Sequence, residues 1–186
     1  MDWESLELAC KYCAKCSLCE RRTNVVFGVG NRNADILFIG EGPGEQEDLL
    51  GEPFVGPAGK LLDDMLSIID LNRENCYIAN IVKCRPPGNR DPKEEEQDAC
   101  IDYLRAQVSL IKPKIIICLG RVAAMRIINP EFRITRDHGF WTNKNGLWMM
   151  AMYHPSALLR DPSKRPETFE DLLSLRRKYR ELGIQI

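Results

Sequence analysis

The chain has 186 residues, enough for one domain spanning 1–186 with a sizeable core. Hydrophobic residues make up 44% and charged residues 28%, the usual balance of a globular protein in water. No apolar run approaches the roughly 20 residues of a membrane span. The acidic start Met1-Asp2-Trp3-Glu4 lacks the apolar stretch of a signal peptide. We therefore expect a cytoplasmic protein without membrane contacts.

With a net charge of −1, the molecule as a whole has no positive electrostatic field that would attract nucleic acid. Any such contact must come from a local basic patch. Two segments qualify, residues 83–93 with Lys83, Arg85, Arg90 and Lys93, and residues 160–165 with Arg160, Lys164 and Arg165. Each holds a single acid. Either segment can equally be a solvated face of the fold.

The chain contains eight cysteines, which in a reducing compartment indicate metal binding or redox chemistry rather than disulfides. Cys10, Cys13, Cys16 and Cys19 stand three residues apart, as in metal and iron–sulfur sites, because a tight turn can direct two thiolates at one centre. We predict that at least two of them bind a metal. The alternative is that some are small apolar core residues.

In chain order, the residue pattern predicts helices that alternate with strands. The expected helices cover 4–9, 58–69, 92–110, 121–128 and 166–182, and the expected core strands cover 35–39, 76–80, 114–119 and 147–153. A short strand at 24–27 and a β-hairpin region at 131–147 complete the prediction. This alternation indicates a mostly parallel sheet with helices on both faces.

A glycine-rich turn, Gly40-Glu41-Gly42-Pro43-Gly44, follows the first core strand and leads into acidic residues that favour a helix start. Such turns in open α/β sheets bind small polar groups. The spacing matches neither G-x-G-x-x-G nor a phosphate-binding P-loop, and an ordinary strand-to-helix turn is the alternative. Phe54 follows on a stiff loop rich in Gly and Pro, where it either serves a site or folds back on the domain.

The four core strands end in unusual residues: the glycine-rich turn, Asn80, Gly120 and His154. Carboxyl ends of parallel strands meet at one edge of a sheet, which is its binding edge. We therefore expect an amide, an imidazole and a bent backbone to meet around one site.

Three stretches resemble the motifs of the family 4 uracil-DNA glycosylases, the iron–sulfur members of their superfamily. They are Gly40-Glu41-Gly42-Pro43-Gly44-Glu45-Gln46-Glu47-Asp48, Asn80 with Lys83-Cys84-Arg85-Pro86-Pro87, and His154-Pro155-Ser156-Ala157-Leu158-Leu159-Arg160. The resemblance spans residues 13–160 and implies a three-layer α/β/α sandwich around a central four-stranded parallel sheet. It also implies a monomer that removes uracil from DNA and leaves an abasic site.

The same resemblance implies a [4Fe-4S] cluster on Cys13, Cys16, Cys84 and Cys100, with a structural role and not one in the reaction. Spacing alone also allows zinc. Cys10 and Cys19 are extra, and Cys76 and Cys118, inside strands, are expected in the core.

Site roles are implied as well. Phe54 stacks on the base and Asn80 reads it, since a side-chain amide complements uracil but not cytosine. His154 donates to uracil O2, assisted by the turn at Gly40, Glu41 and Gly42, while Glu41 positions water. Glu47, or the backbone near Gly44, blocks thymine. Arg85, with Arg90, and the Ser156–Leu159 loop with Leu158 and Arg160 contact DNA.

Two other classes of function compete with this interpretation. A sensor that traps uracil-DNA covalently is disfavoured, because the chain has only His138 and His154 and no inserted basic loop between residues 80 and 114. A plain iron–sulfur redox protein explains the cysteines but leaves Phe54, Asn80 and His154 without a purpose.

Overall fold

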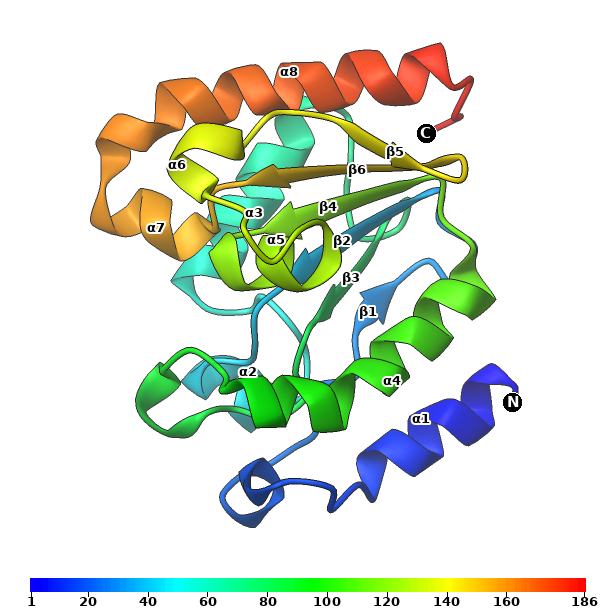
Figure 1. The fold of residues 1–186 in the computed structure, drawn as a ribbon, viewed down its shortest axis with the longest axis vertical. Coiled ribbons are helices and arrows are strands. Elements are labelled where there is room, and N and C mark those ends of the chain that lie inside the picture. Colours follow the sequence, from blue (N-terminus) through cyan, green and yellow to red (C-terminus); the bar gives the residue numbers. More distant parts are fainter.

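The computed structural model describes all 186 residues and contains a six-stranded sheet (Figure 1). Its strands are β1 (Val29–Gly30), β2 (Ile36–Gly40), β3 (Tyr77–Asn80), β4 (Ile115–Leu119), β5 (Thr142–Lys144) and β6 (Leu147–Met152), in the spatial order β1-β3-β2-β4-β6-β5. The inner four are parallel, and the short edge strands β1 and β5 pair antiparallel to them. The expected four-stranded parallel sheet is therefore confirmed, with two edge strands added.

Eight α-helices and three short 3₁₀ helices connect and cover the strands. They are α1 (Trp3–Lys11), η1 (Ser17–Glu20), α2 (Glu45–Leu50), α3 (Pro57–Ile68), η2 (Pro87–Asn89), α4 (Glu94–Ile111), α5 (Arg121–Ile127), α6 (Ile134–Asp137), α7 (Pro155–Arg160), η3 (Pro162–Lys164) and α8 (Arg165–Glu181).

Local chemistry explains where several helices begin. The Asp2 carboxylate caps α1 by accepting the Ser5 N–H at 2.9 Å. Pro57 stands in the first turn of α3, where its missing N–H costs nothing. Three glutamates occupy the first turn of α4, and one of them, Glu96, accepts the Lys93 N–H at 2.8 Å.

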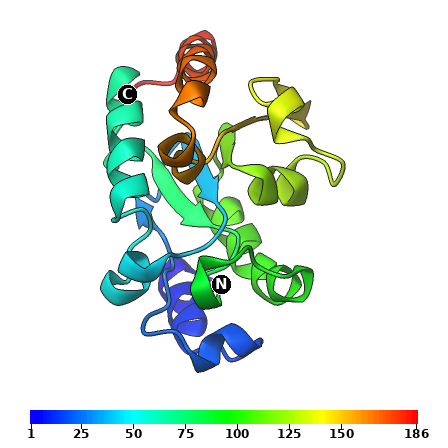
Figure 2. The ribbon, with the colours of Figure 1, turned by 90° about the vertical axis from the view of Figure 1, so that its left-hand side faces the viewer.

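Two hydrophobic clusters hold the layers together, one on each face of the sheet. Along β2, Leu37 and Ile39 belong to a cluster with residues of α1, α4 and α5. Ile36 and Phe38 belong to a second cluster with residues of α3 and α8. Successive strand residues point to opposite faces, so the expected three-layer α/β/α arrangement is confirmed. In Figure 2, α3 lies on one side of the sheet and α5 on the other.

Three expectations about local structure need correction, one of them in part. Residues 24–27 form no strand, and the first edge strand is β1 at Val29–Gly30. The expected hairpin is confirmed at its turn, since β5 pairs antiparallel with β6, but the earlier part of that region holds the short helix α6. Residues 156–159, expected as a loop, belong to the helix α7, because Pro155 begins a helix instead of ending a strand.

The register of the parallel strands brings their carboxyl ends to one edge. Gly40 at the end of β2 is the direct neighbour of Asn80 at the end of β3. Gly120 follows β4, and His154 stands two residues beyond β6. In Figure 1 the arrowheads of β2, β4 and β6 point to the same side of the molecule. No helix in this structure is both long and apolar enough to span a bilayer.

Candidate active site

A cavity of about 660 Å³ opens at this edge of the sheet. It is lined by most of the residues that the sequence predicts for the site, including Glu41, Gly42, Gly44, Glu47, Phe54, Asn80, His154, Ser156 and Arg160. These residues come from three segments that are far apart in the chain, 41–54, 80 and 154–160. Parallel strands of matched register bring them together.

Gly40, predicted to contact the base, does not itself line the cavity but lies directly behind two residues that do, Phe54 and Asn80. A Cβ atom at Gly40 would lie 2.6 Å from Cζ of Phe54 and would also collide with Oδ1 of Asn80. Only glycine fits between the ring and the amide. Asn80 is 2% exposed, and its Oδ1 has no hydrogen-bond partner within the protein. A buried amide oxygen of this kind is available for a ligand donor.

Phe54 and His154 form the aromatic part of the wall. Their ring centroids are 5.5 Å apart and the ring planes are inclined by 30°. Phe54 is buried and has a backbone φ of 54°, which is rare for an aromatic residue. Phe54 was expected either to serve a site or to fold back on the domain. It does fold back on the domain, and its ring also lines the cavity.

His154 is held as a neutral imidazole in one tautomer. The Ser156 backbone N–H donates to its Nδ1 at 3.0 Å, so the ring proton of neutral His154 is on Nε2. Burial, with a smaller contribution from the Arg160 guanidinium, lowers the pKa of His154 from 6.5 to about 4. The site therefore contains an uncharged hydrogen-bond donor at neutral pH.

Glu41 has the opposite shift. Burial raises the pKa of Glu41 from 4.5 to about 7, and the nearby Asp91 carboxylate adds to the rise. Its one protein donor is the Val122 N–H, 3.4 Å from Oε1. A carboxyl group with this pKa exchanges a proton near neutral pH, which suits a group that polarises water.

Glu47 lines the cavity, but one of its carboxylate oxygens is hydrogen-bonded to the backbone. Its Oε1 accepts the N–H groups of Val55 and Gly56, both at 3.1 Å. The carboxylate thus fastens the loop that carries Phe54. Its role in excluding thymine remains a prediction.

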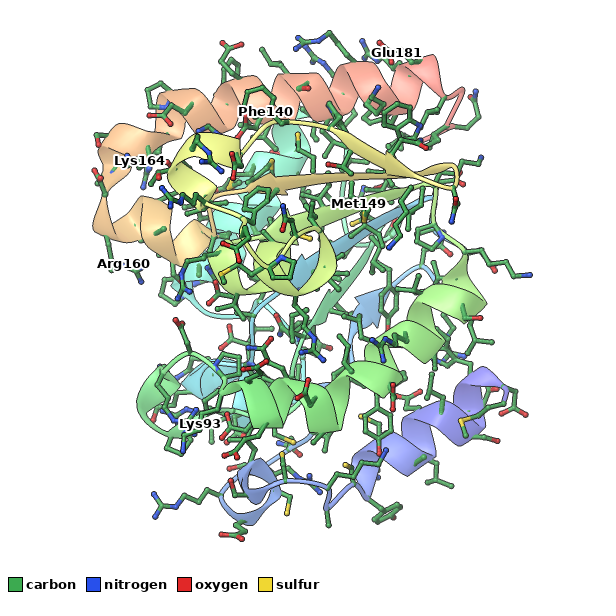
Figure 3. The ribbon with its side chains drawn as sticks, in the orientation of Figure 1. Lys93, Phe140, Met149, Arg160, Lys164 and Glu181 are labelled. Atoms are coloured by element: carbon green, nitrogen blue, oxygen red, sulfur yellow. The ribbon has the colours of Figure 1, made fainter.

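Arginines surround the mouth of the cavity. Arg90 pairs with Glu96 at 2.7 Å, Arg121 pairs with Asp91 at 2.6 Å, and Arg160 lines the same rim. Figure 3 places Arg160 and Lys164 on the side toward which the parallel strands point. The lining also contains the acids Glu41, Glu45, Glu47 and Asp91, so Arg160 is the arginine of this rim that no ion pair engages.

Lys83 and Arg85 behave differently from the basic patch expected at 83–93. Lys83 is 1% exposed and its ammonium donates to Gln107 Oε1 at 2.7 Å, so it cannot meet a phosphate. Arg85 lies outside the cavity lining, and its Nε donates to Asn89 Oδ1 at 2.7 Å.

The two leucines of α7 differ in their exposure. Leu158, predicted to contact DNA, is 1% exposed and belongs to the hydrophobic cluster shared with α3 and α8. Leu159 is 43% exposed and lines the cavity. The prediction for Leu158 is therefore wrong, because a helix turns neighbouring side chains to different faces.

Six cysteines line a second, smaller cavity away from the first. They are Cys10, Cys13, Cys16, Cys19, Cys84 and Cys100. All are free thiols. The Lys83 N–H donates to Sγ of Cys100 at 3.3 Å, and Arg22 donates to Sγ of Cys84 at 3.4 Å. No three His, Cys, Asp or Glu side chains are arranged as ligands of a single metal ion. Cys76 and Cys118 are buried in the core, as expected.

Sequence reasoning missed two residues of the cavity and one that supports it from outside. Arg121 and Tyr153 line the cavity. Both had a signal, since one follows Gly120 and the other precedes His154 at the strand ends already singled out. Arg73 contacts the loop of Phe54 from outside the cavity, and no sequence pattern announces it.

The family model of the uracil DNA glycosylase superfamily matches residues 27–175. The type-4 uracil-DNA glycosylase of Archaeoglobus fulgidus is 50% identical over 169 residues, covering 86% of this chain and 84% of that protein. Its counterpart from Thermotoga maritima is 46% identical over 157 residues, covering 82% and 81%. That from Sulfurisphaera tokodaii is 45% identical over 181 residues, covering 92% and 80%. The chain belongs to the type-4 branch of the uracil-DNA glycosylase superfamily.

Proposed function

We propose that this protein is a uracil-DNA glycosylase, which takes uracil out of DNA and hydrolyses its N-glycosidic bond to leave an abasic site. The observation that carries the proposal is the convergence of Phe54, Asn80 and His154 on one cavity at the sheet edge. A base inside a duplex is out of reach of such a cavity, so the enzyme must flip the nucleotide.

Base recognition is assigned to Phe54 and Asn80. The Phe54 ring offers a flat apolar surface on which a flipped base stacks. The Asn80 amide accepts from N3–H of uracil and donates to O4. Cytosine presents the reverse pattern at these positions, and each mispaired buried group costs roughly 1–3 kcal/mol. Gly40 supports both side chains, since it leaves space for the ring and the amide side by side.

Bond cleavage is assigned to His154 and the glycine-rich turn. Cleavage gives an oxocarbenium-like sugar and a uracil anion, so donors aimed at the developing negative charge speed the reaction. Neutral His154 donates from Nε2 to uracil O2, since its Nδ1 accepts the Ser156 N–H. A neutral donor gains strength as the anion forms and costs no proton transfer. Backbone N–H groups of Glu41 and Gly42 assist.

Water activation is assigned to Glu41. In its ionised form, Glu41 accepts a proton from water that attacks C1′ of the sugar, and it stabilises the positive charge that develops there. Its pKa of about 7 keeps a large fraction of the group ionised near neutral pH.

DNA contacts are assigned to the rim of the cavity. Arg160 and Ser156 bind phosphates next to the flipped nucleotide, Arg90 does so from another part of the rim, and Arg85, outside the cavity lining, contacts the DNA farther from the base. Leu159, exposed beside the cavity, fills the space that the base leaves in the stack.

A [4Fe-4S] cluster is assigned to Cys13, Cys16, Cys84 and Cys100. All four line one cavity, and two of them already accept N–H donors, as cluster sulfurs do. When bound, the cluster supplies a crosslink and no step of the reaction. It ties the N-terminal segment to the start of α4.

We further infer that the chain acts as a single domain and a monomer in the cytoplasm. All groups of the proposed site come from one chain, and both hydrophobic clusters share one sheet. Eight free thiols fit a reducing compartment.

The test uses protein purified without oxygen and an oligonucleotide with one uracil. The expected products are free uracil and an abasic site, with no release from matched oligonucleotides that carry thymine or cytosine. A stable protein–DNA adduct contradicts the proposal in favour of a trap. Binding without base release contradicts it in favour of a sensor. If the protein neither binds the oligonucleotide nor releases uracil, every role on uracil-DNA is contradicted.

A further inference from the structure

Phe54 is held in a backbone conformation that an isolated chain avoids. Its φ of 54° lies in the left-handed region, which a bulky residue rarely adopts. Such a conformation persists only where the surroundings determine it. Three contacts do so here, from three different elements.

Two of these contacts belong to the loop and its neighbouring helices. Glu47 on α2 accepts the N–H groups of Val55 and Gly56 through Oε1. Gly59 on α3 lies directly against the backbone of Phe54, so that a Cβ atom at Gly59 would come within 2.8 Å of Phe54 Cα. These contacts fix the amide side and the rear of the loop.

The third contact is made by Arg73, which reaches the loop from the segment between α3 and β3. Its Nη1 donates to the Pro53 carbonyl at 2.8 Å, and its Nη2 donates to the Phe54 carbonyl. Its Nε donates to Asp63 Oδ1 on α3 at 2.9 Å. The guanidinium thus satisfies two loop carbonyls and anchors them to a helix.

The geometry requires the planar fork of arginine. Three N–H donors meet three fixed acceptors, and the side chain is only 24% exposed. An ammonium group has a single nitrogen and cannot reach both carbonyls and the carboxylate in this arrangement. Arg73 itself does not line the cavity, so it touches Phe54 from behind.

We propose that Arg73 is a positioning residue for the base-stacking ring. It fixes the Pro53 and Phe54 carbonyls and thereby sets the direction in which the Phe54 ring faces the cavity. The inference rests on the proposed function, in which that ring stacks on the flipped uracil. Arg73 contributes to the rate through Phe54 alone.

The test is a double-mutant cycle of Arg73→Met and Phe54→Ala, measured by single-turnover uracil release and by melting. We expect Arg73→Met to slow release by about tenfold to a hundredfold, since small misplacements of a positioned group have effects of this size. In the Phe54→Ala background the same change should have no further effect on the rate. Arg73→Lys, which keeps the charge and one donor, should recover part of the rate.

Arg105→Met serves as the matched control, because Arg105 also pairs with an acid but on the exposed face of α4. It should release uracil like the unaltered protein. Rates are compared at a temperature where every variant is folded, and Arg73→Lys takes the place of Arg73→Met if the latter does not fold.

Three outcomes overturn the inference, and they separate it from the proposed function. If Phe54→Ala is slow but the Arg73 variants release uracil at the normal rate, the positioning role is wrong and the stacking role stands. If the Arg73 defect persists in the Phe54→Ala background, Arg73 acts by another route. If Phe54→Ala itself is fully active, both the stacking role and the positioning role are wrong.

Discussion

Burial favours the uncharged forms of Glu41 and His154, two side chains of one cavity. It shifts their pKa values in opposite directions, because one is an acid and the other a base. The pKa of Glu41 rises to about 7 and that of His154 falls to about 4. Near neutral pH the imidazole is therefore a neutral donor, while the carboxyl group is close to its midpoint. A reaction that expels an anion and adds water needs this combination.

The pH dependence of catalysis should follow Glu41. We expect single-turnover uracil release to rise as the pH passes about 7, because only ionised Glu41 accepts a proton. Glu41→Gln should be slower and lose this rise. Glu131→Gln, an exposed acid outside the cavity, should keep it. An unchanged profile in Glu41→Gln would remove Glu41 from water activation.

Stability should show the cost of the same carboxylate. Between pH 4.5 and about 7 the folded protein holds a proton on Glu41 that the unfolded chain releases, so the unfolding free energy falls as pH rises. Glu41→Gln removes that cost, which reaches up to about 3 kcal/mol at pH 8. The variant should therefore melt above the unaltered protein at pH 8 and close to it at pH 4.5. Calorimetric melting at both pH values decides the matter.

Base choice should depend on the Asn80 amide. Asn80→Asp places an acid where uracil needs a donor to O4, so uracil release should fall by about tenfold to a hundredfold. The protonated acid complements cytosine, and measurable cytosine release is the second expected result. Asn33→Asp, at an exposed turn position, is the control. Normal excision by Asn80→Asp would exclude Asn80 as the reader.

At the scale of elements, two adjacent residues of α7 have different proposed roles, one in the stability of the fold and the other in contact with DNA. Leu158→Ala should lower the unfolding free energy by about 2–5 kcal/mol, since it empties a core position. Leu159→Ala should leave melting unchanged and slow uracil release from duplex DNA by about tenfold, with little effect on single strands. Equal losses on both substrates would contradict the role of Leu159 as a wedge.

The elements that the sequence predicted well are those with a strong period and clear ends. The four parallel strands are short apolar runs that stop at Gly, Asn or His, and parallel register alone brings those ends together. Asn80 and His154 were therefore predictable as residues of one sheet edge, where both line the same cavity. Helix α7 was not predictable, since a proline such as Pro155 can begin either a loop or a helix.

Burial that depends on distant elements was also beyond the sequence. Lys83 looks like part of a basic patch, but Gln107 of α4 captures its ammonium in the interior. Arg73 looks like any surface arginine, yet it fastens the Phe54 loop. In both cases the partner comes from an element whose packing no local pattern reveals.

At the scale of the whole molecule, the cysteine cavity joins α1 and η1 to the body of the fold. We expect Cys84→Ser to lower iron content and melting temperature together, because a lost cluster ligand releases the N-terminal segment. Cys118→Ala, in the core of β4, should lower melting but keep the iron. Full iron content in Cys84→Ser would exclude Cys84 as a ligand.

Only three residues separate Asn80 from Cys84. Within that span the Ile81 and Val82 N–H groups donate to the carbonyls of Gly40 and Glu41, at 3.0 and 3.2 Å. The segment that carries Asn80, the proposed reader of the base, therefore also carries Cys84, a proposed ligand of the cluster. Oxidation of the thiols, for example by peroxide, should displace the segment between Cys84 and Asn80. It should therefore lower the selectivity for uracil before the sheet unfolds.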